Sequence, residues 1–123
     1  MFACIAHAEA YQAAADDLKV FLKTRGLVSE AETGARGFRR LNHSDAVIGL
    51  WSQKALMSPY RLVLEKRMLE AWAEGRLILV KLDTSLPPVG LRDLPAIDAS
   101  FEQYRKMAAW PRIERAVREA ITA

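Results

Sequence analysis

The chain has 123 residues, of which 51% are apolar and 27% are charged, and this length lets one domain bury a core without metal ions or disulfides. Its single cysteine, Cys4, has no partner in the chain for a disulfide, which favours a reducing compartment and a cytoplasmic protein. No apolar stretch is long enough to span a bilayer, and the basic residues behind the net charge of +3 are dispersed, so we expect neither a membrane nor a nucleic-acid partner.

The first quarter of the sequence predicts a strand, a helix and a second strand. The apolar run Phe2–Ile5 is typical of a buried strand. Apolar residues then recur at helical spacing over residues 11–25, and Gly26 can supply the left-handed conformation that ends many helices. Leu27–Val28 is long enough only for a short strand.

Residues 29–44, SEAETGARGFRRLNHS, contain two glycines and no sustained period. This pattern predicts a loop with one short helix near Phe38–Leu41. A further buried strand follows at Ala46–Trp51, which is apolar on both faces, as expected in the middle of a parallel sheet.

The next helix has start and stop signals in the sequence. Ser58 is expected as its N-cap, and Pro59 suits the first helical position because its missing N–H would have no partner there. The helix is predicted to run to about Glu74, where Gly75 ends it.

The last third predicts two more strands and a closing helix. Leu77–Leu82 is a second central strand, and residues 83–95 form a proline-rich connection without a helical pattern. Ala96–Asp98 is expected as a short edge strand. The closing helix is expected to break at Trp110–Pro111 and to continue to Ile121.

Strands that alternate with helices predict a parallel sheet whose right-handed crossovers cover both faces. We therefore expect one domain over residues 1–123, a three-layer α/β/α flavodoxin-like fold with a parallel sheet of about five strands. Ligands of such sheets bind beyond the carboxyl ends of the strands. The sequence places AHAE, WSQK and DTS at those ends.

The order and content of these segments resemble a bacterial TIR (Toll/interleukin-1 receptor) domain over nearly the whole chain. FACIAHAE is similar to the family's first strand and loop, DAVIGLWS to its third strand with a closing serine, and SPY to the start of the next helix. GRLILVKLD and then PPVGLRDLPAIDAS resemble its fourth strand and the loop that leads to its final strand. The resemblance implies either signalling through contacts between TIR domains or cleavage of NAD.

The chain departs from the family in two places. After Gly26 it lacks the family's aromatic–aspartate pair, and it reaches Asp45 with roughly a turn or two of helix missing. Enzymatic members carry a glutamate four residues after the aromatic that opens the helix following the third strand. Counted from Tyr60, that position is Leu64, and the carboxylate present is Glu65.

The local context of Glu65 leaves two interpretations open. At about 100° per residue, one arc of the predicted helix carries Glu65 among apolar residues, with Arg61 one turn earlier as a local partner. The arc comprises Met68, Trp72, Glu65, Leu69 and Leu62. Because burying an unpaired charge costs several kcal/mol, Glu65 is either half of a structural pair with Arg61 at the edge of the core or open to a cleft.

In an enzymatic member, the resemblance implies that Glu65 stabilises the positive charge that develops on the ribose of NAD as the C–N glycosidic bond breaks. The nucleotide would be the substrate, and no cofactor would be required. The residues that we assign to this nucleotide site beside Glu65 are Cys4, His7, Trp51, Ser52, Tyr60 and Arg61.

Several of these residues also have plain structural interpretations. Trp51 ends a buried strand and is favoured as a core residue, while Ser52 is favoured as a turn residue. His7 is favoured as a polar surface histidine. Cys4 lies on a buried strand, where thiols are usually inert. The spacing of the His, Cys and carboxylate residues predicts no metal site.

Two functional hypotheses follow. The first is a signalling or assembly module in bacterial signalling or defence. It would bind other TIR domains, homotypic or heterotypic, and form a weak homo-oligomer. Arg36 and Arg39 in the shortened loop are expected to contribute to these contacts. The alternative is an NAD nucleosidase, a hydrolase or cyclase, with Glu65 as the catalytic carboxylate. A phospho-acceptor domain is disfavoured because the first strand ends without the paired aspartates that hold Mg²⁺. The chain ends soon after its final helix, which is compatible with one domain of a longer protein.

Overall fold

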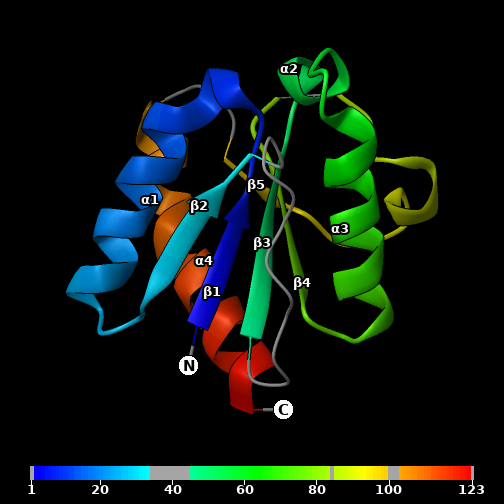
Figure 1. The fold of residues 1–123 in the computed structure, drawn as a ribbon. Helices are drawn as coiled ribbons and strands as arrows, with labels where there is room; N and C mark the ends of the chain where they lie inside the picture. The colour runs from blue at the N-terminus through cyan, green and yellow to red at the C-terminus, as the bar shows by residue number, and fades with distance from the viewer. Residues whose placement is uncertain (1, 34–44, 84, 100–102, 123) are drawn as a thin grey trace.

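The computed structural model describes residues 2–33, 45–83, 85–99 and 103–122. One sheet of parallel strands runs through it in the order β2-β1-β3-β4-β5 (Figure 1). The strands are β1 (Phe2–Ala6), β2 (Ser29–Glu32), β3 (Asp45–Trp51), β4 (Leu77–Lys81) and β5 (Ile97–Asp98). The predicted α/β fold with a parallel sheet of about five strands is therefore confirmed.

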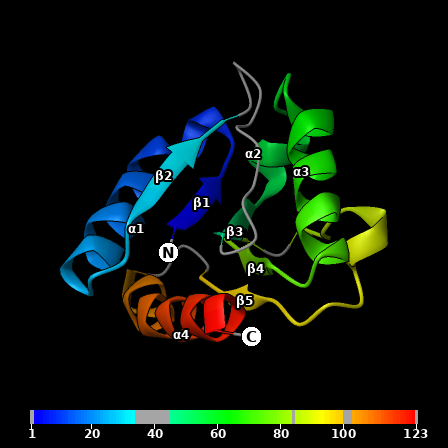
Figure 2. The same cartoon turned by 60° about the horizontal axis from the view of Figure 1, so that its bottom comes forward.

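Helices cover both faces of this sheet (Figures 1 and 2). They are the 3₁₀ helices η1 (Glu9–Tyr11) and η2 (Val89–Leu91) and the α-helices α1 (Gln12–Thr24), α2 (Gln53–Leu56), α3 (Arg61–Ala73) and α4 (Gln103–Thr122). Because side chains alternate along a strand, Ile5 of β1 packs under α1 and α4, whereas Cys4 packs under α3. This alternation produces the three layers.

The two central strands are buried on both faces, as their sequences predict. Val47 and Ile48 of β3, and Leu79 and Val80 of β4, are all at most 3% exposed. The strands pair in parallel with Val47 opposite Leu77. Their burial makes the sheet a rigid support for the segments that follow its carboxyl ends.

The prediction for the second strand was wrong by two residues. Gly26 ends α1 with a φ of 80°, and Leu27 then turns back, its N–H donating to the carbonyl of Leu22 at 2.9 Å. The strand β2 begins only at Ser29 and uses residues that the sequence assigns to a loop. As an edge strand, β2 has one hydrogen-bonded neighbour, so Glu30 can stay exposed in it.

The start of α3 differs from its prediction as well. The helix begins at Arg61 with Tyr60 as its N-cap residue, and Pro59 lies in the preceding turn rather than in the helix. Ser58 does not cap α3, although its Oγ accepts a hydrogen bond from the N–H of Tyr60 at 3.1 Å. The unpredicted short helix α2 fills the space between β3 and this turn. At the other end, Gly75 follows the helix with a φ of 70°.

The apolar arc expected to face the core from α3 is, apart from Met68, not buried. Leu62 is 70% exposed and Trp72 is 47% exposed. The buried face lies roughly 100° away, one residue step round the helix. It consists of Leu64, Arg67, Met68 and Ala71. The sequence pattern misled because Arg67, a charged residue, is only 5% exposed.

The closing helix α4 is continuous across Pro111, so the predicted break is wrong. Pro111 is exposed, and the opposite side of the helix places Ile113 and Val117 in the core, which outweighs the one lost backbone hydrogen bond. The predicted short helix at 38–41 and the predicted contact residues Arg36 and Arg39 lie outside the described residues. Within the described ranges, no helix is both long and apolar enough to cross a membrane.

Candidate functional site

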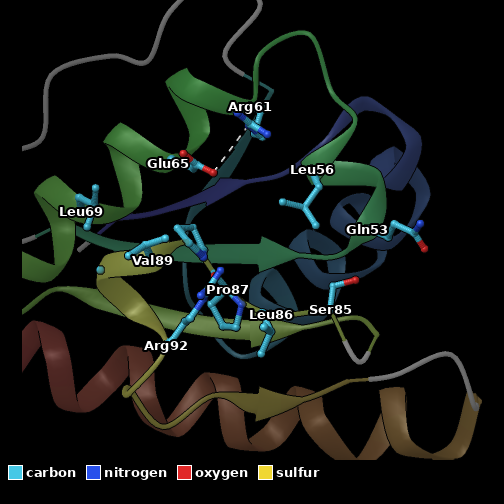
Figure 3. Close-up of a pocket in the computed structure, with 12 residues that line it drawn as sticks. Gln53, Leu56, Arg61, Glu65, Leu69, Ser85, Leu86, Pro87, Val89 and Arg92 are labelled. Atoms are coloured by element: carbon cyan, nitrogen blue, oxygen red, sulfur yellow. Dashed lines mark hydrogen bonds and ion pairs between the residues drawn. The ribbon is translucent and has the colours of Figure 1, made fainter.

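A cleft of about 680 Å³ opens between α3 and the connection from β4 to β5 (Figure 3). Gln53 follows β3 and Ser85 follows β4, so the cleft begins at the carboxyl ends of the two central strands, where parallel α/β sheets usually bind ligands. Its lining comprises Gln53 and Leu56 from the α2 region, Arg61, Glu65 and Leu69 from α3, and Ser85, Leu86, Pro87, Pro88, Val89, Gly90 and Arg92 from the connection.

Hydrogen bonds to the end of β3 fix the near part of the connection. The indole Nε1 of Trp51 donates to the carbonyl of Leu86 at 2.8 Å. The carboxylate of Asp83 accepts from the N–H of Gln53 at 2.8 Å and from the N–H of Ser85 at 2.9 Å. Trp51 is fully buried, so the prediction of a core residue is confirmed. It acts at the cleft by holding the wall in place.

The far part of the connection packs directly on α3. A Cβ atom added to Gly90 would lie 2.9 Å from Cδ2 of Leu69, so a larger residue there would require the end of the Leu69 side chain to move. Arg92 steadies the same segment, since its Nε donates to the carbonyl of Pro87 at 3.2 Å. Both ends of the wall are therefore fixed by contacts within the domain.

Glu65 and Arg61 point toward each other on the α3 wall (Figure 3). Nε of Arg61 lies 3.8 Å from Oε1 of Glu65, and the side chains are 46% and 24% exposed, respectively. The pair expected from their spacing exists, and both of its members line the cleft. Leu64, which the sequence resemblance would align with the glutamate of TIR enzymes, is fully buried beneath α3. The carboxylate that reaches the cleft is that of Glu65.

Of the residues assigned to a nucleotide site, only Glu65 and Arg61 line this cleft. Tyr60 is half-buried at the start of α3. Ser52 is fully buried and caps α2, because its Oγ accepts from the N–H of Ala55 at 3.3 Å. Tyr60 and Ser52 therefore shape the turns around the cleft without lining it.

His7 was expected on the surface, and that prediction is wrong because its side chain is fully buried. Its backbone N–H donates to the carbonyl of Glu32 at 3.1 Å, which extends the pairing of β1 with β2 by one residue. Nδ1 lies 2.7 Å from the carbonyl of Ala8 and must carry the proton, since a carbonyl only accepts. Nε2 has no hydrogen-bond partner among the described residues.

Cys4 is buried as predicted, on the sheet face beneath α3. Its thiol donates to Oε2 of Glu32 at 3.2 Å. Burial raises the pKa of Cys4 to about 12, and the nearby charge of Glu32 acts in the same direction, whereas Arg67 opposes it. The thiol is therefore protonated at neutral pH and is a poor nucleophile. Within the described ranges, no group of three or more His, Cys, Asp or Glu residues could hold a metal ion.

Large apolar side chains are exposed on α3, at α2 and on the connection, and four of them, Leu56, Leu69, Leu86 and Val89, line the cleft. We call them the α2–α3 apolar surface. Its members are Leu56, Met57, Leu62, Val63, Leu69, Trp72, Leu86 and Val89. In the rest of the described chain, the large exposed apolar side chains are Val20 and Val28, in and just after α1. The sequence carried a signal for part of this surface, because Leu62, Leu69 and Trp72 belong to the apolar arc of α3 and are exposed in the structure.

Comparison with known proteins adds no second line of evidence on this site. No model of a known protein family matches the chain, and no curated protein sequence matches it. A proposal for its function therefore rests on the sequence resemblance together with the cleft and the α2–α3 apolar surface.

Proposed function

We propose that this chain is a signalling or assembly module that works through contacts with other TIR domains. The observation that carries the proposal is the α2–α3 apolar surface. Leu62 is 70% exposed, Met57 74% and Val89 78%, and each exposes apolar area whose burial is favourable by roughly 25 cal/mol per Å². Gathered apolar side chains of this kind usually mark interaction sites.

The distribution of these side chains supports a contact on one side of the domain. The helix α3, which carries much of the α2–α3 apolar surface, lies on one side of the sheet, and α1 lies on the opposite side (Figures 1 and 2). Charged residues such as Lys66 and Glu70 also lie exposed on α3. Because a contact there must also accommodate these polar groups, we expect a weak, concentration-dependent association.

The test compares two substitutions that place an aspartate at exposed apolar positions on opposite sides of the domain. Sedimentation velocity of the wild type is expected to show weak association that increases with concentration. Leu62→Asp should remove most of it, whereas Val20→Asp should leave it unchanged. Both positions are well exposed, at 70% and 63%, so neither variant should lose stability. A wild type that stays monomeric, both alone and mixed with other TIR domains, would contradict the proposal.

A second candidate function is NAD cleavage, and the position of Glu65 on the cleft wall favours it. In that reaction the C–N bond to nicotinamide breaks, the ribose gains positive charge, and a water molecule then bonds to the ribose carbon and loses a proton. A carboxylate beside the ribose stabilises the developing charge. The proposal of an assembly module has more support, because Arg61 already offsets the charge of Glu65 and because Leu64 occupies the family's glutamate position.

Release of nicotinamide from NAD, followed by chromatography, tests the second candidate. The expected result for an enzyme is release by the wild type and its loss in Glu65→Gln. No release by the wild type at high protein concentration would remove this candidate and leave the first unaffected.

A further inference from the structure

We propose that the cleft binds a short segment of a partner protein that combines large apolar side chains with a carboxylate. This inference rests on the proposed function, since it names the partner chemistry for part of the α2–α3 apolar surface. It is carried by the shape of the cleft, by its apolar rim and by the guanidinium of Arg92, which has no carboxylate partner in the part of the chain that the structure describes.

The size of the cleft limits what it can take. About 680 Å³ is within the range of pockets that bind small ligands, so it can hold a few side chains but not a whole helix. Leu56, Leu69, Leu86 and Val89 stand at its rim and are 38–78% exposed. Apolar side chains of an incoming segment would cover these four residues, and the contact would remove both sets of side chains from water.

The cleft is also preformed. The hydrogen bond from Trp51 to the carbonyl of Leu86 ties one wall to the end of β3, and Gly90 of the same wall packs against Leu69 of α3. A preformed site avoids the cost of ordering a loop when the ligand binds. Most of the ordering cost would therefore fall on the incoming segment, which favours a short one.

The charges in the cleft select the polar part of the ligand. Its lining carries two guanidinium groups, those of Arg61 and Arg92, and one carboxylate, that of Glu65. Glu65 lies against Arg61, whereas Arg92 contacts a backbone carbonyl and has no carboxylate partner among the described residues. A carboxylate in the ligand can pair with Arg92. A basic segment would instead meet the like charge of Arg92, and the one carboxylate of the lining, Glu65, already faces Arg61.

The experiment uses short random peptides displayed on phage and selected against the whole chain. Enriched peptides are expected to combine Asp or Glu with Leu, Phe or Trp. Fluorescence anisotropy of the tightest peptide should show about tenfold weaker binding to Arg92→Glu, as expected when a charge contact becomes repulsive. Lys19→Glu, the same change at an exposed position of α1, should bind as the wild type does.

A charge swap makes the test specific. The same peptide with its acid replaced by Lys should bind Arg92→Glu better than it binds the wild type. Arg92→Gln removes the charge and keeps a donor for the carbonyl of Pro87, so it separates loss of charge from loss of structure. Val89→Asp should also weaken binding of the original peptide, whereas Val20→Asp should leave that binding unchanged.

Three results would overturn the inference: enriched peptides that are basic or lack acids, binding that Arg92→Glu and Val89→Asp leave unchanged, and self-association through the cleft with no peptide bound. Failure here is distinguishable from failure of the proposed function. Domain association that persists in Arg92→Glu and Val89→Asp but disappears in Leu62→Asp would support the assembly function and reject the peptide site. Specific peptide binding by a chain that associates with no TIR domain would support the peptide site and reject the assembly function.

Discussion

Glu65→Gln is expected to change the stability of the domain very little. One nitrogen–oxygen contact of 3.8 Å joins Glu65 to Arg61, and the two side chains are 24% and 46% exposed. Pairs with this i,i+4 spacing at exposed sites contribute about 0.3–0.5 kcal/mol, and glutamine preserves the shape and the helix propensity of the side chain. We therefore expect a loss of about 0.5 kcal/mol, equivalent to roughly 2 °C in the thermal midpoint.

The assay is urea denaturation of the wild type, Glu65→Gln, Arg61→Gln and the double variant, each followed by a measurement of nicotinamide release from NAD. The double-mutant cycle should give a coupling free energy of no more than about 0.5 kcal/mol. If the domain cleaves NAD, Glu65→Gln should lose about 10²–10³-fold in rate, because a preorganised electrostatic contact acts at the transition state. Its nearly unchanged stability means that such a loss would be chemical and not a result of unfolding.

Two outcomes would refute this reasoning. A destabilisation of about 2 kcal/mol or more would mean that Glu65 is half of a desolvated structural pair, as found for buried charges deprived of a partner. Nicotinamide release that is undiminished in Glu65→Gln would exclude Glu65 from the chemistry.

Three further predictions concern the layers that support the cleft. Leu79→Asp should unfold the domain, because Leu79 is 3% exposed in a central strand and an unpaired charge there costs more than a small domain has in reserve; an unchanged thermal midpoint would contradict this. Gly49→Ala should cost about 1–3 kcal/mol in urea denaturation, since its Cβ would lie 2.9 Å from Cε of the fully buried Met68, and the double variant with Met68→Ala should show favourable coupling. Cys4 has its pKa raised from 9.0 to about 12 in the folded chain, so it favours folding below pH 9, and this contribution is lost as pH rises from 9 toward 12. Between pH 8 and pH 10 the wild type should therefore lose about 1 kcal/mol more than Cys4→Ala does, and equal losses would show that the thiol ionises as easily folded as unfolded.

The sequence predicts most of the fold because the signals for the central layer are local. Strands β3 and β4 are apolar on both faces, and only a doubly covered parallel sheet buries such runs completely. Gly26 and Gly75 end α1 and α3 at positive φ, as their positions indicate. These features depend on residues close together in the chain.

The errors occur where distant contacts outweigh local pattern. The strand β2 is rich in charge and forms because β1 offers it a hydrogen-bonding edge. Arg67 points into the protein, where its guanidinium lies 3.9 Å from Sγ of Cys4. Because a charged residue was expected on the surface, the prediction placed the buried face of α3 on the wrong side of the helix. His7 is buried through a backbone bond to Glu32, on a strand that is distant in sequence.

The candidate site also has one part that local sequence predicts and one part that depends on distant contacts. The Arg61–Glu65 pair follows from helical spacing, so it could be predicted. The facing wall could not, because the path of residues 85–92 depends on the Trp51–Leu86 hydrogen bond and on the fit of Gly90 against Leu69. Proline-rich connections carry no period from which such a path can be inferred.

Concentration-dependent methyl NMR tests most directly whether the domain associates through the α2–α3 apolar surface. With leucine and valine methyl groups labelled, raising the protein concentration should shift the signals of Leu62, Leu86 and Val89. The signals of Val20 and Val28, which are also exposed but lie in and just after α1, should stay in place. Shifts confined to Val20 and Val28, or no shift of any methyl signal over the whole concentration range, would contradict an assembly function for this surface.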